Sequence, residues 1–235
     1  NPLMLLRIAQ GDAYCMATEY VNIKKFSNGR GEESIHDALL FERYVKHPTH
    51  ALAAGNYTDD TQMSIAIAEH LLAGEEPTNL NFANHFMEAF ARDKRDGYSR
   101  GFQVILDKSK TGQDLIDKLV PDSTKNGAAM RSVPLGVIKN ADERDRFIAK
   151  QAGVTHATED GYISSLCVAE MSHLALFTDM PFFEIMEDIS ANIPDKFCDI
   201  LLDSWKFGPV MDRTAKGGFD VGLNTVWAVA TLLRE

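Results

Sequence analysis

The sequence predicts an all-α protein, and three features lead to this prediction. Apolar residues recur at the three- and four-residue spacing of amphipathic helices along most of the chain. No stretch alternates apolar and polar residues long enough to indicate a sheet. No Asn-Gly or Asp-Gly pair stands between two strand-like runs. We therefore expect one compact helical domain spanning residues 1–235.

The clearest helix covers residues 59–72. Thr58 occupies the expected N-cap position, and a glycine followed by a proline in "AGEEP" ends the helix. One apolar stripe collects Met63, Ala66, Ile67 and His70 with Leu71. This stripe predicts the side of the helix that faces the core.

Further helices are expected before and after this one, with loops at the glycine-rich segments "SNGRGEE", "DGYSRGF", "TKNGAAMRS" and "TAKGGFD". The first helix precedes the residue 59–72 helix and the others follow it, in the order Leu3–Met16, Asn81–Arg92, Gln113–Leu119, Asp142–Gln151, Glu159–Phe177, Phe182–Ala191, Asp195–Trp205 and Leu223–Leu233.

Composition excludes some classes of partner. The chain has 34 acidic and 24 basic residues and a formal charge of -10, so general nucleic-acid binding is not expected. No apolar run approaches the roughly 20 residues of a membrane span, and no membrane partner is expected. Three cysteines, at positions 15, 167 and 198, form no paired spacing, which is typical of free thiols in a reducing cytoplasm. Cys15 and Cys167 lie in apolar runs and are expected to be inert core thiols.

The run Thr58-Asp59-Asp60-Thr61 allows two interpretations. Threonine and acids at a helix start satisfy free N–H groups and oppose the helix dipole. Two adjacent carboxylates, however, repel each other and gain most from a cation between them. Carboxylate and hydroxyl oxygens are the ligands that Mg²⁺ prefers. The run is therefore either a cap or a metal site.

The segment "NGAAMRSVPLG", from Asn126 to Gly136, also allows two interpretations. Its small residues let backbone N–H groups approach a ligand closely, and a helix beginning there would direct its N-terminus at a phosphate. Alternatively it is an ordinary turn that enters a helix shortened by Pro134.

Three polar residues stand out near other helix ends. Asp12 lies inside the mostly apolar first helix, where it is either a hydrogen-bonded structural acid or a general base. Glu19 lies near the end of that helix, and His156 precedes another, where it caps, packs or contacts a ligand. These motifs could converge on one cavity.

These motifs carry a resemblance to a known family. The order GDAxxxxxE, YTDDTQM, GYSRGF, NGAAMRSVPLG and THATEDGY resembles the ADP-ribosylglycohydrolases, including the dinitrogenase-reductase-activating glycohydrolases. The resemblance runs from about Arg7 to Ala169. It implies an orthogonal all-α fold, a binuclear Mg²⁺ or Mn²⁺ site, and hydrolysis of the bond joining ADP-ribose to a protein side chain or to a small molecule.

The resemblance also implies roles for individual residues. Glu19, Asp59 and Asp60 look like the catalytic acids, and Thr58 joins the two aspartates as a metal ligand. The expected substrate contacts are Gly97, Tyr98, Ser99, Asn126, Gly127, Ala128, Ala129, Met130, Arg131 and His156. The resemblance makes Asp12 structural.

The C-terminal part departs from the family pattern. Relatives complete the metal site with a GDTDT-like motif that this sequence lacks. Either "GLNT", residues 222–225, stands in its place, or "GGFDVGLNTVWAVATLL" is the helix that precedes it and the chain stops short of the motif. One metal ion or none then becomes an alternative to two. A catalytically impaired binder of ADP-ribose or a related nucleotide is the alternative function, and a purely structural role is a third without specific support.

Overall fold

The computed structural model describes residues 3–19, 42–47, 52–199, 201 and 222–234. Every regular element in these ranges is a helix, and the only β contact among them is an isolated bridge between Asp122 and His156. The all-α prediction is confirmed. In the same ranges, no helix is both long enough and apolar enough to cross a membrane.

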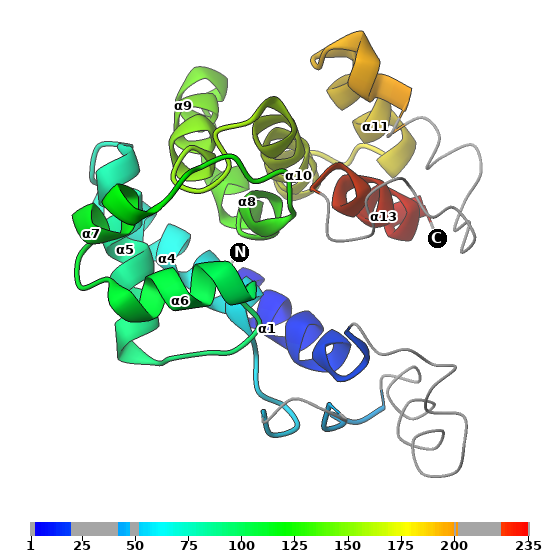
Figure 1. Ribbon diagram of the computed structural model, residues 1–235. Helices are drawn as coiled ribbons and strands as arrows, with labels where there is room; N and C mark the ends of the chain where they lie inside the picture. The colour runs from blue at the N-terminus through cyan, green and yellow to red at the C-terminus, as the bar shows by residue number, and fades with distance from the viewer. Residues whose placement is uncertain (1–2, 20–41, 48–51, 200, 202–221, 235) are drawn as a thin grey trace.

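Most predicted helices are present. Figure 1 shows their arrangement, and the labels used here follow it. The elements are α1 (Met4–Cys15), the 3-10 helix η1 (Met16–Thr18), α4 (Asp59–Ala73), α5 (Asn79–Arg92), α6 (Arg100–Lys108), α7 (Gly112–Lys118), α8 (Gly127–Met130), the 3-10 helix η2 (Val133–Val137), α9 (Ala141–Ala152), α10 (Glu159–Phe177), α11 (Phe182–Ala191) and α13 (Gly222–Arg234).

Two predicted helices, α10 and α11, have the predicted bounds at both ends. The others differ from the predicted bounds by one or two residues. Of the helix expected at Asp195–Trp205, residues 195–199 and 201 are helical and the rest lie outside the described residues. The segments "SNGRGEE" and "TAKGGFD" also lie outside them.

Two of the expected loops contain helical residues, and one of them, "TKNGAAMRS", includes α8. The segment "DGYSRGF" was expected to be a loop, but α6 begins within it at Arg100. Gly101 lies in the first turn of that helix, and a side chain at this position would meet no atom within 4 Å. The glycine therefore marks no turn here, and the apolar residues after it decide the local structure.

Side-chain caps fix the start of several helices. In each case a hydroxyl or amide oxygen accepts a hydrogen bond from the N–H three residues later. The capping residues are Thr78 of α5, Thr111 of α7, Asn140 of α9 and Thr158 of α10.

The buried residues form two apolar clusters that share α10. One cluster fills the space among α4, α5, α7 and α9, around Phe82, Phe86 and Ile148. The second joins α10 to α11 and α13, around Met186 and Val226. Helix α10 contacts η2, α8, α9, α11 and α13, so it has buried residues on more than one face. Helix α10 therefore contributes residues to both clusters, and Figure 1 shows it between α9 and α13.

Candidate active site

Asp12 of α1 caps the first turn of α4. Its carboxylate accepts hydrogen bonds from the backbone N–H groups of Thr58 and Thr61, at 2.8 and 3.2 Å, and from their hydroxyls, at 2.7 and 2.6 Å. A carboxylate that accepts from free N–H groups at a helix start satisfies them and opposes the positive end of the dipole. Asp12 thus fixes the position of the acids that follow Thr58.

The prediction that Thr58 is the N-cap residue of this helix is confirmed, but capping by its side chain is not found. Thr58 occupies the N-cap position of α4, but its side chain makes no cap hydrogen bond. Its hydroxyl donates to Asp12 instead, because the carboxylate of a neighbouring helix lies 2.7 Å away. The same hydroxyl also lies within hydrogen-bond distance of Asp60 Oδ2, at 3.4 Å, and it can donate its single proton to only one of the two acids at a time.

Asp59 is held in place by a close contact with Gly97. Gly97 has a φ of +115°, and a Cβ added to it would lie 2.0 Å from Asp59 Oδ1 and 3.0 Å from the Cβ of Thr58. No other residue type fits at this position without displacing Asp59. The expected ligand-lining Gly97 therefore acts on the acid pair by leaving space for it.

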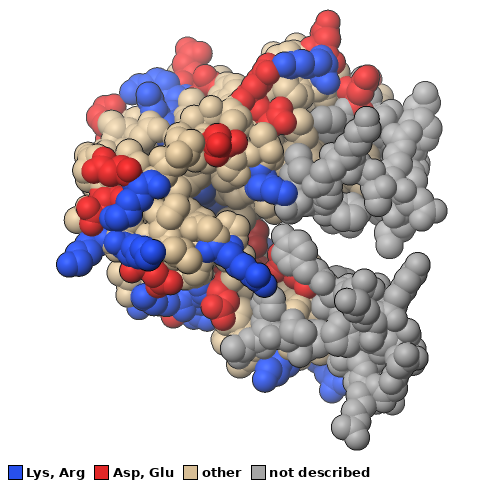
Figure 2. All heavy atoms as spheres, viewed as in Figure 1, with Lys and Arg blue, Asp and Glu red and all other residues tan. Residues whose placement is uncertain are grey.

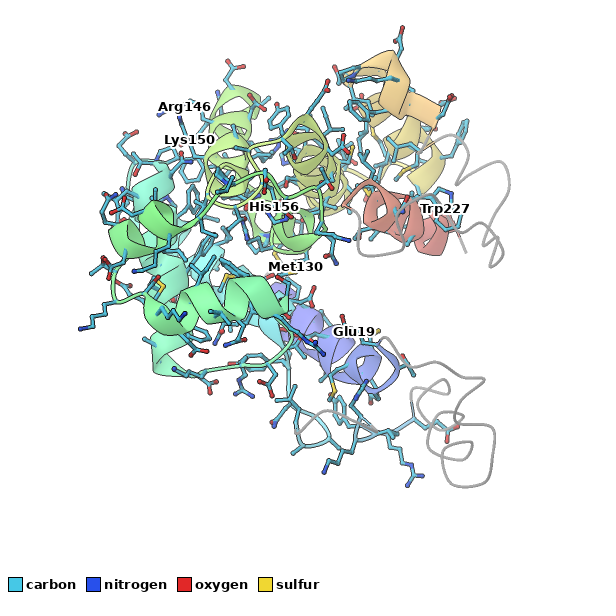
Figure 3. The ribbon with its side chains drawn as sticks, in the orientation of Figure 1. Glu19, Met130, Arg146, Lys150, His156 and Trp227 are labelled. Carbon is cyan, nitrogen blue, oxygen red and sulfur yellow. The ribbon has the colours of Figure 1, made fainter. Side chains whose placement is uncertain are left out.

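A cavity of about 500 Å³ opens beside these acids. Its acidic side consists of Asp12, Glu19 and Asp60, and the remaining lining comes from Ile8, Gly11, Cys15, Met16, Thr18, Asn126, Ala129, Met130, Val133, Val168, Thr225 and Val229. Figure 2 shows a hollow in this region with acidic atoms at its back. Figure 3 shows Glu19 at the end of the α1–η1 segment and Met130 on α8, from opposite sides of the cavity.

The acids strongly perturb one another. Burial, together with repulsion from Asp12 and Glu19, raises the pKa of Asp60 to about 7. Burial and the charges of Asp60 and Glu19 raise the pKa of Asp59 well above its ordinary value. The pKa of Glu19 is raised by burial and by Asp12. The carboxylates of Asp12, Glu19, Asp59 and Asp60 have no basic partner in these interactions. A proton or a cation between them would reduce their mutual repulsion.

The donor set matches a hard divalent cation. Asp59, Asp60 and Thr58 offer only oxygen atoms, and the Thr58 hydroxyl lies 3.4 Å from Asp60 Oδ2. Only Asp60 of these three lines the cavity, with Glu19 beside it. The residues therefore fit one ion at the edge of the cavity better than two.

The chain aligns with a known family along nearly its whole length. The model of the ADP-ribosylglycohydrolase family matches residues 4–233. The chain belongs to the ADP-ribosylglycohydrolase family.

Curated relatives of this chain include the ADP-ribosylhydrolase ARH3 of Homo sapiens, which is 29% identical over 176 residues, 69% of this chain and 48% of that protein. The protein of the same name from Gallus gallus is 27% identical over 184 residues, 71% of this chain and 50% of that protein. The chain spans about half the length of these relatives.

The Asn126 loop divides between the cavity and the core. Asn126, Ala129 and Met130 line the cavity and Ala128 does not, although both alanines are fully buried. The helix that follows Asn126 is a single turn, Gly127–Met130, so it lacks the aligned peptides that build a strong dipole. The expected positive helix end at a phosphate is therefore weak here.

Arg131 is turned away from the cavity. Its guanidinium donates to the side chain and backbone carbonyl of Gln151, at 2.6 and 2.9 Å, and to the Thr155 hydroxyl at 2.9 Å. It also lies over the ring of Phe86, 4.5 Å from its centroid. Burial lowers the pKa of Arg131 to about 9, so the side chain remains charged at neutral pH. In this structure Arg131 holds α9 to the loop.

His156 lies behind the loop, beside Gly127. Its Cε1 is 2.9 Å from the position that a Cβ on Gly127 would take. Its Nδ1 shares a hydrogen bond with the Thr155 hydroxyl, while its buried Nε2 has no partner among the described residues. Burial and the charge of Arg131 lower the pKa of His156 to about 3, so the ring is neutral. A neutral ring with one unpaired nitrogen can still accept or donate one hydrogen bond.

Tyr98 and Ser99 lie outside the cavity lining. The Tyr98 hydroxyl is buried and donates to Gln62 Oε1 at 2.7 Å, which ties the Gly97 turn to α4. Ser99 is the N-cap residue of α6. Both residues position the turn that contacts Asp59.

Sequence reasoning missed part of the cavity wall. Cys15 was expected in the core, but it is exposed and lines the cavity, whereas Cys167 is buried as expected. Cys15 is the last residue of α1. Thr225 of the "GLNT" segment also lines the cavity, at the start of α13. In the sequence, only the alignment of "GLNT" with the C-terminal motif of relatives pointed to Thr225.

Proposed function

We propose that this chain hydrolyses the glycosidic bond between ADP-ribose and a protein side chain, or the same bond in a related small ADP-ribose derivative. Family membership supports this reaction class. The observation that carries it is the placement of Glu19 and Asp60 on one cavity with Asn126 and Met130. A reducing compartment such as the cytoplasm suits its three free cysteines.

The acids suit the charge that develops at the sugar. Cleavage at C1 of the ribose gives a transition state with oxocarbenium character, which nearby carboxylates stabilise. Glu19 has a raised pKa and lines the cavity, so it is placed to accept the proton of an attacking water. Asp60 lines the same wall and shares this negative potential.

Mg²⁺ or Mn²⁺ would be held by Thr58, Asp59 and Asp60 and would supply charge neutralisation and a fixed point for the ribose hydroxyls. Two neighbouring residues hold these ligands in position. Asp12 accepts a hydrogen bond from the Thr58 hydroxyl and holds it 3.4 Å from Asp60 Oδ2, and Gly97 leaves room for the Asp59 side chain.

The test is release of free ADP-ribose from an ADP-ribosylated protein in the presence of Mg²⁺. We expect release by the wild type and its loss in Asp60→Ala. Asp117→Ala, which changes an exposed acid of α7, should leave the rate unchanged. Equal rates for the wild type and Asp60→Ala would refute the proposal.

A second candidate function is binding of ADP-ribose without turnover. It is favoured by the small number of acids on the cavity wall and by the burial of Asp59 against Gly97. Calorimetry with ADP-ribose, with and without Mg²⁺, separates the two. Tight binding that needs no metal and gives no ADP-ribose release would favour the binder, and absence of binding would exclude it.

A further inference from the structure

A second group of metal-ligating side chains lies outside the cavity, where α4 turns into α5. His70 belongs to the last turns of α4, Glu75 follows its C-terminal Gly74, and His85 lies on α5. One ligand atom from each residue lies within 4.8 Å of the other two. In the described part of the chain, no other three histidine, cysteine or acidic side chains meet this closely.

The distances are close to those of a metal centre. Glu75 Oε2 lies 3.8 Å from His70 Nδ1 and 3.4 Å from His85 Nε2. Ligands at about 2.0–2.1 Å from a tetrahedral zinc ion are about 3.3–3.4 Å apart. Small side-chain rotations would therefore bring all three atoms onto one ion. The two rings are perpendicular, with an interplanar angle of 82°, and their centroids are 5.2 Å apart.

The histidines have unused nitrogen atoms. Both nitrogens of His70 and Nδ1 of His85 are buried and have no hydrogen-bond partner within the part of the chain that the structure describes. A buried polar atom without a partner costs free energy, and a bound ion would satisfy His70 Nδ1. Phe82 packs against the His70 ring with centroids 4.1 Å apart and holds it in this orientation. Burial and the neighbouring His85 lower the pKa of His70, so the ring is in the neutral form that metals bind.

A second carboxylate lies near the other nitrogen of the His85 ring, beyond hydrogen-bond distance. Glu88 Oε2 lies 3.8 Å from His85 Nδ1, one helical turn farther along α5. Ligating histidines usually donate their other N–H to a carboxylate or a carbonyl oxygen, which orients the ring. Glu75 is 45% exposed, so an ion could enter from its side and keep a water as fourth ligand.

We propose that His70, Glu75 and His85 form a binding site for Zn²⁺ or a similar transition-metal ion, separate from the acids of the cavity. Two imidazoles and one carboxylate suit zinc, whereas Mg²⁺ prefers an all-oxygen set. A bound ion cross-links the C-terminal end of α4 to α5. Since α4 begins with Asp59 and Asp60, the ion steadies the far end of the helix that carries both acids. The site does not depend on the proposed glycohydrolase activity.

The experiment is a Co²⁺ and Zn²⁺ titration in excess Mg²⁺, which occupies oxygen-only sites. Co²⁺ should give the visible absorption bands of four-coordinate nitrogen and oxygen ligation, and one equivalent of Zn²⁺ should abolish them. Zn²⁺ should also raise the Tm of the wild type. His85→Gln and Glu75→Gln should lose the bands and the Tm increase, and Glu88→Gln should weaken binding about tenfold.

Two controls separate this site from others. Glu76→Gln changes the neighbouring glutamate, which contacts Arg146 instead, and should bind zinc like the wild type. Asp60→Asn should also retain zinc binding, although the cavity acids are altered. Metal-free Tm values of the Glu75 and His85 variants close to the wild-type value establish that they fold. The proposal would be overturned if the wild type did not bind zinc, if His85→Gln still bound it, or if Asp60→Asn lost it.

Discussion

Three aspartates at the start of α4 have three different roles. Asp59 and Asp60 belong to this helix, and Asp12 contacts it from α1. The carboxylate of Asp12 accepts four hydrogen bonds from Thr58 and Thr61. Asp59 is buried against Gly97, and Asp60 faces the cavity. Surroundings decide these roles, since a carboxylate with donors around it is stabilised and one among like charges is not.

At the residue scale, the free energy of unfolding should depend on Asp60 in a pH-dependent way. The folded-state pKa of Asp60 is about 7 against an ordinary 3.8, so in the metal-free chain this acid costs stability as pH rises through that window. Asp60→Asn should therefore stabilise the metal-free protein above about pH 7, on the order of 2 kcal/mol after allowance for cavity water, and should have little effect below about pH 4.

Urea unfolding at several pH values, in chelator, measures this effect. Excess Mg²⁺ should reverse its sign if the acid pair holds the ion, because the wild type then gains binding free energy that the variant lacks. A variant that is less stable than the wild type at high pH without metal would contradict the prediction.

A second prediction at this scale concerns Gly97. Alanine at this position places a methyl group against Asp59 and strains a backbone with a φ of +115°. Gly97→Ala should lower the free energy of unfolding by about 2 kcal/mol or more and abolish ADP-ribose release. Gly101→Ala is the matched control: it meets nothing within 4 Å in α6 and should raise stability by up to about 1 kcal/mol. Similar unfolding midpoints for the two variants would refute the argument.

At the scale of the element, α4 depends on α1 for its start. The N-cap residue Thr58 makes no cap hydrogen bond, and Asp12 takes over this role from another helix. The position of the acid pair is therefore fixed by a contact between residues 46 and 49 positions apart.

Asp12→Asn should show this dependence. The amide keeps the shape of the carboxylate but directs N–H groups at donors, so we expect a loss of about 2–4 kcal/mol of stability and a weaker Mg²⁺ response. Asp142→Asn, at the exposed start of α9, should change stability by less than about 0.5 kcal/mol. Thermal unfolding of both variants provides the measurement, and equal Tm losses would show that the cap contributes nothing special.

The elements also show where local patterns succeed and fail. Helices α10 and α11 were predicted at their true ends because a cap, a proline and a continuous apolar run agree there. Helix α6 was missed because Gly97 and Gly101 look alike in the sequence. Only the first has a positive φ, and that difference arises from its contact with Asp59.

At the scale of the whole molecule, the cavity joins residues from distant parts of the chain. Glu19 follows η1, Asp60 lies in the first turn of α4, Met130 ends α8, and Thr225 lies on α13. Such a site forms only in the folded chain, so a ligand that binds there stabilises the fold by mass action.

ADP-ribose should therefore raise the Tm, with a gain of about 2.7 kcal/mol at a hundredfold excess over Kd. Met130→Trp, which fills the cavity from α8, should remove this increase. Val104→Trp, at an exposed position of α6, should retain it. A Tm increase that persists in Met130→Trp would place the ligand elsewhere.

The sequence by itself determined the all-α class, most helix positions and the family resemblance, because periodicity, caps and short motifs are local properties of the chain. Tertiary structure alone decided that Arg131 points into the core, that Cys15 faces the cavity, and that His70 and His85 meet at Glu75. Burial, the pairing of polar atoms and the pKa of a carboxylate depend on neighbours that are remote in sequence, and only packing brings those neighbours together.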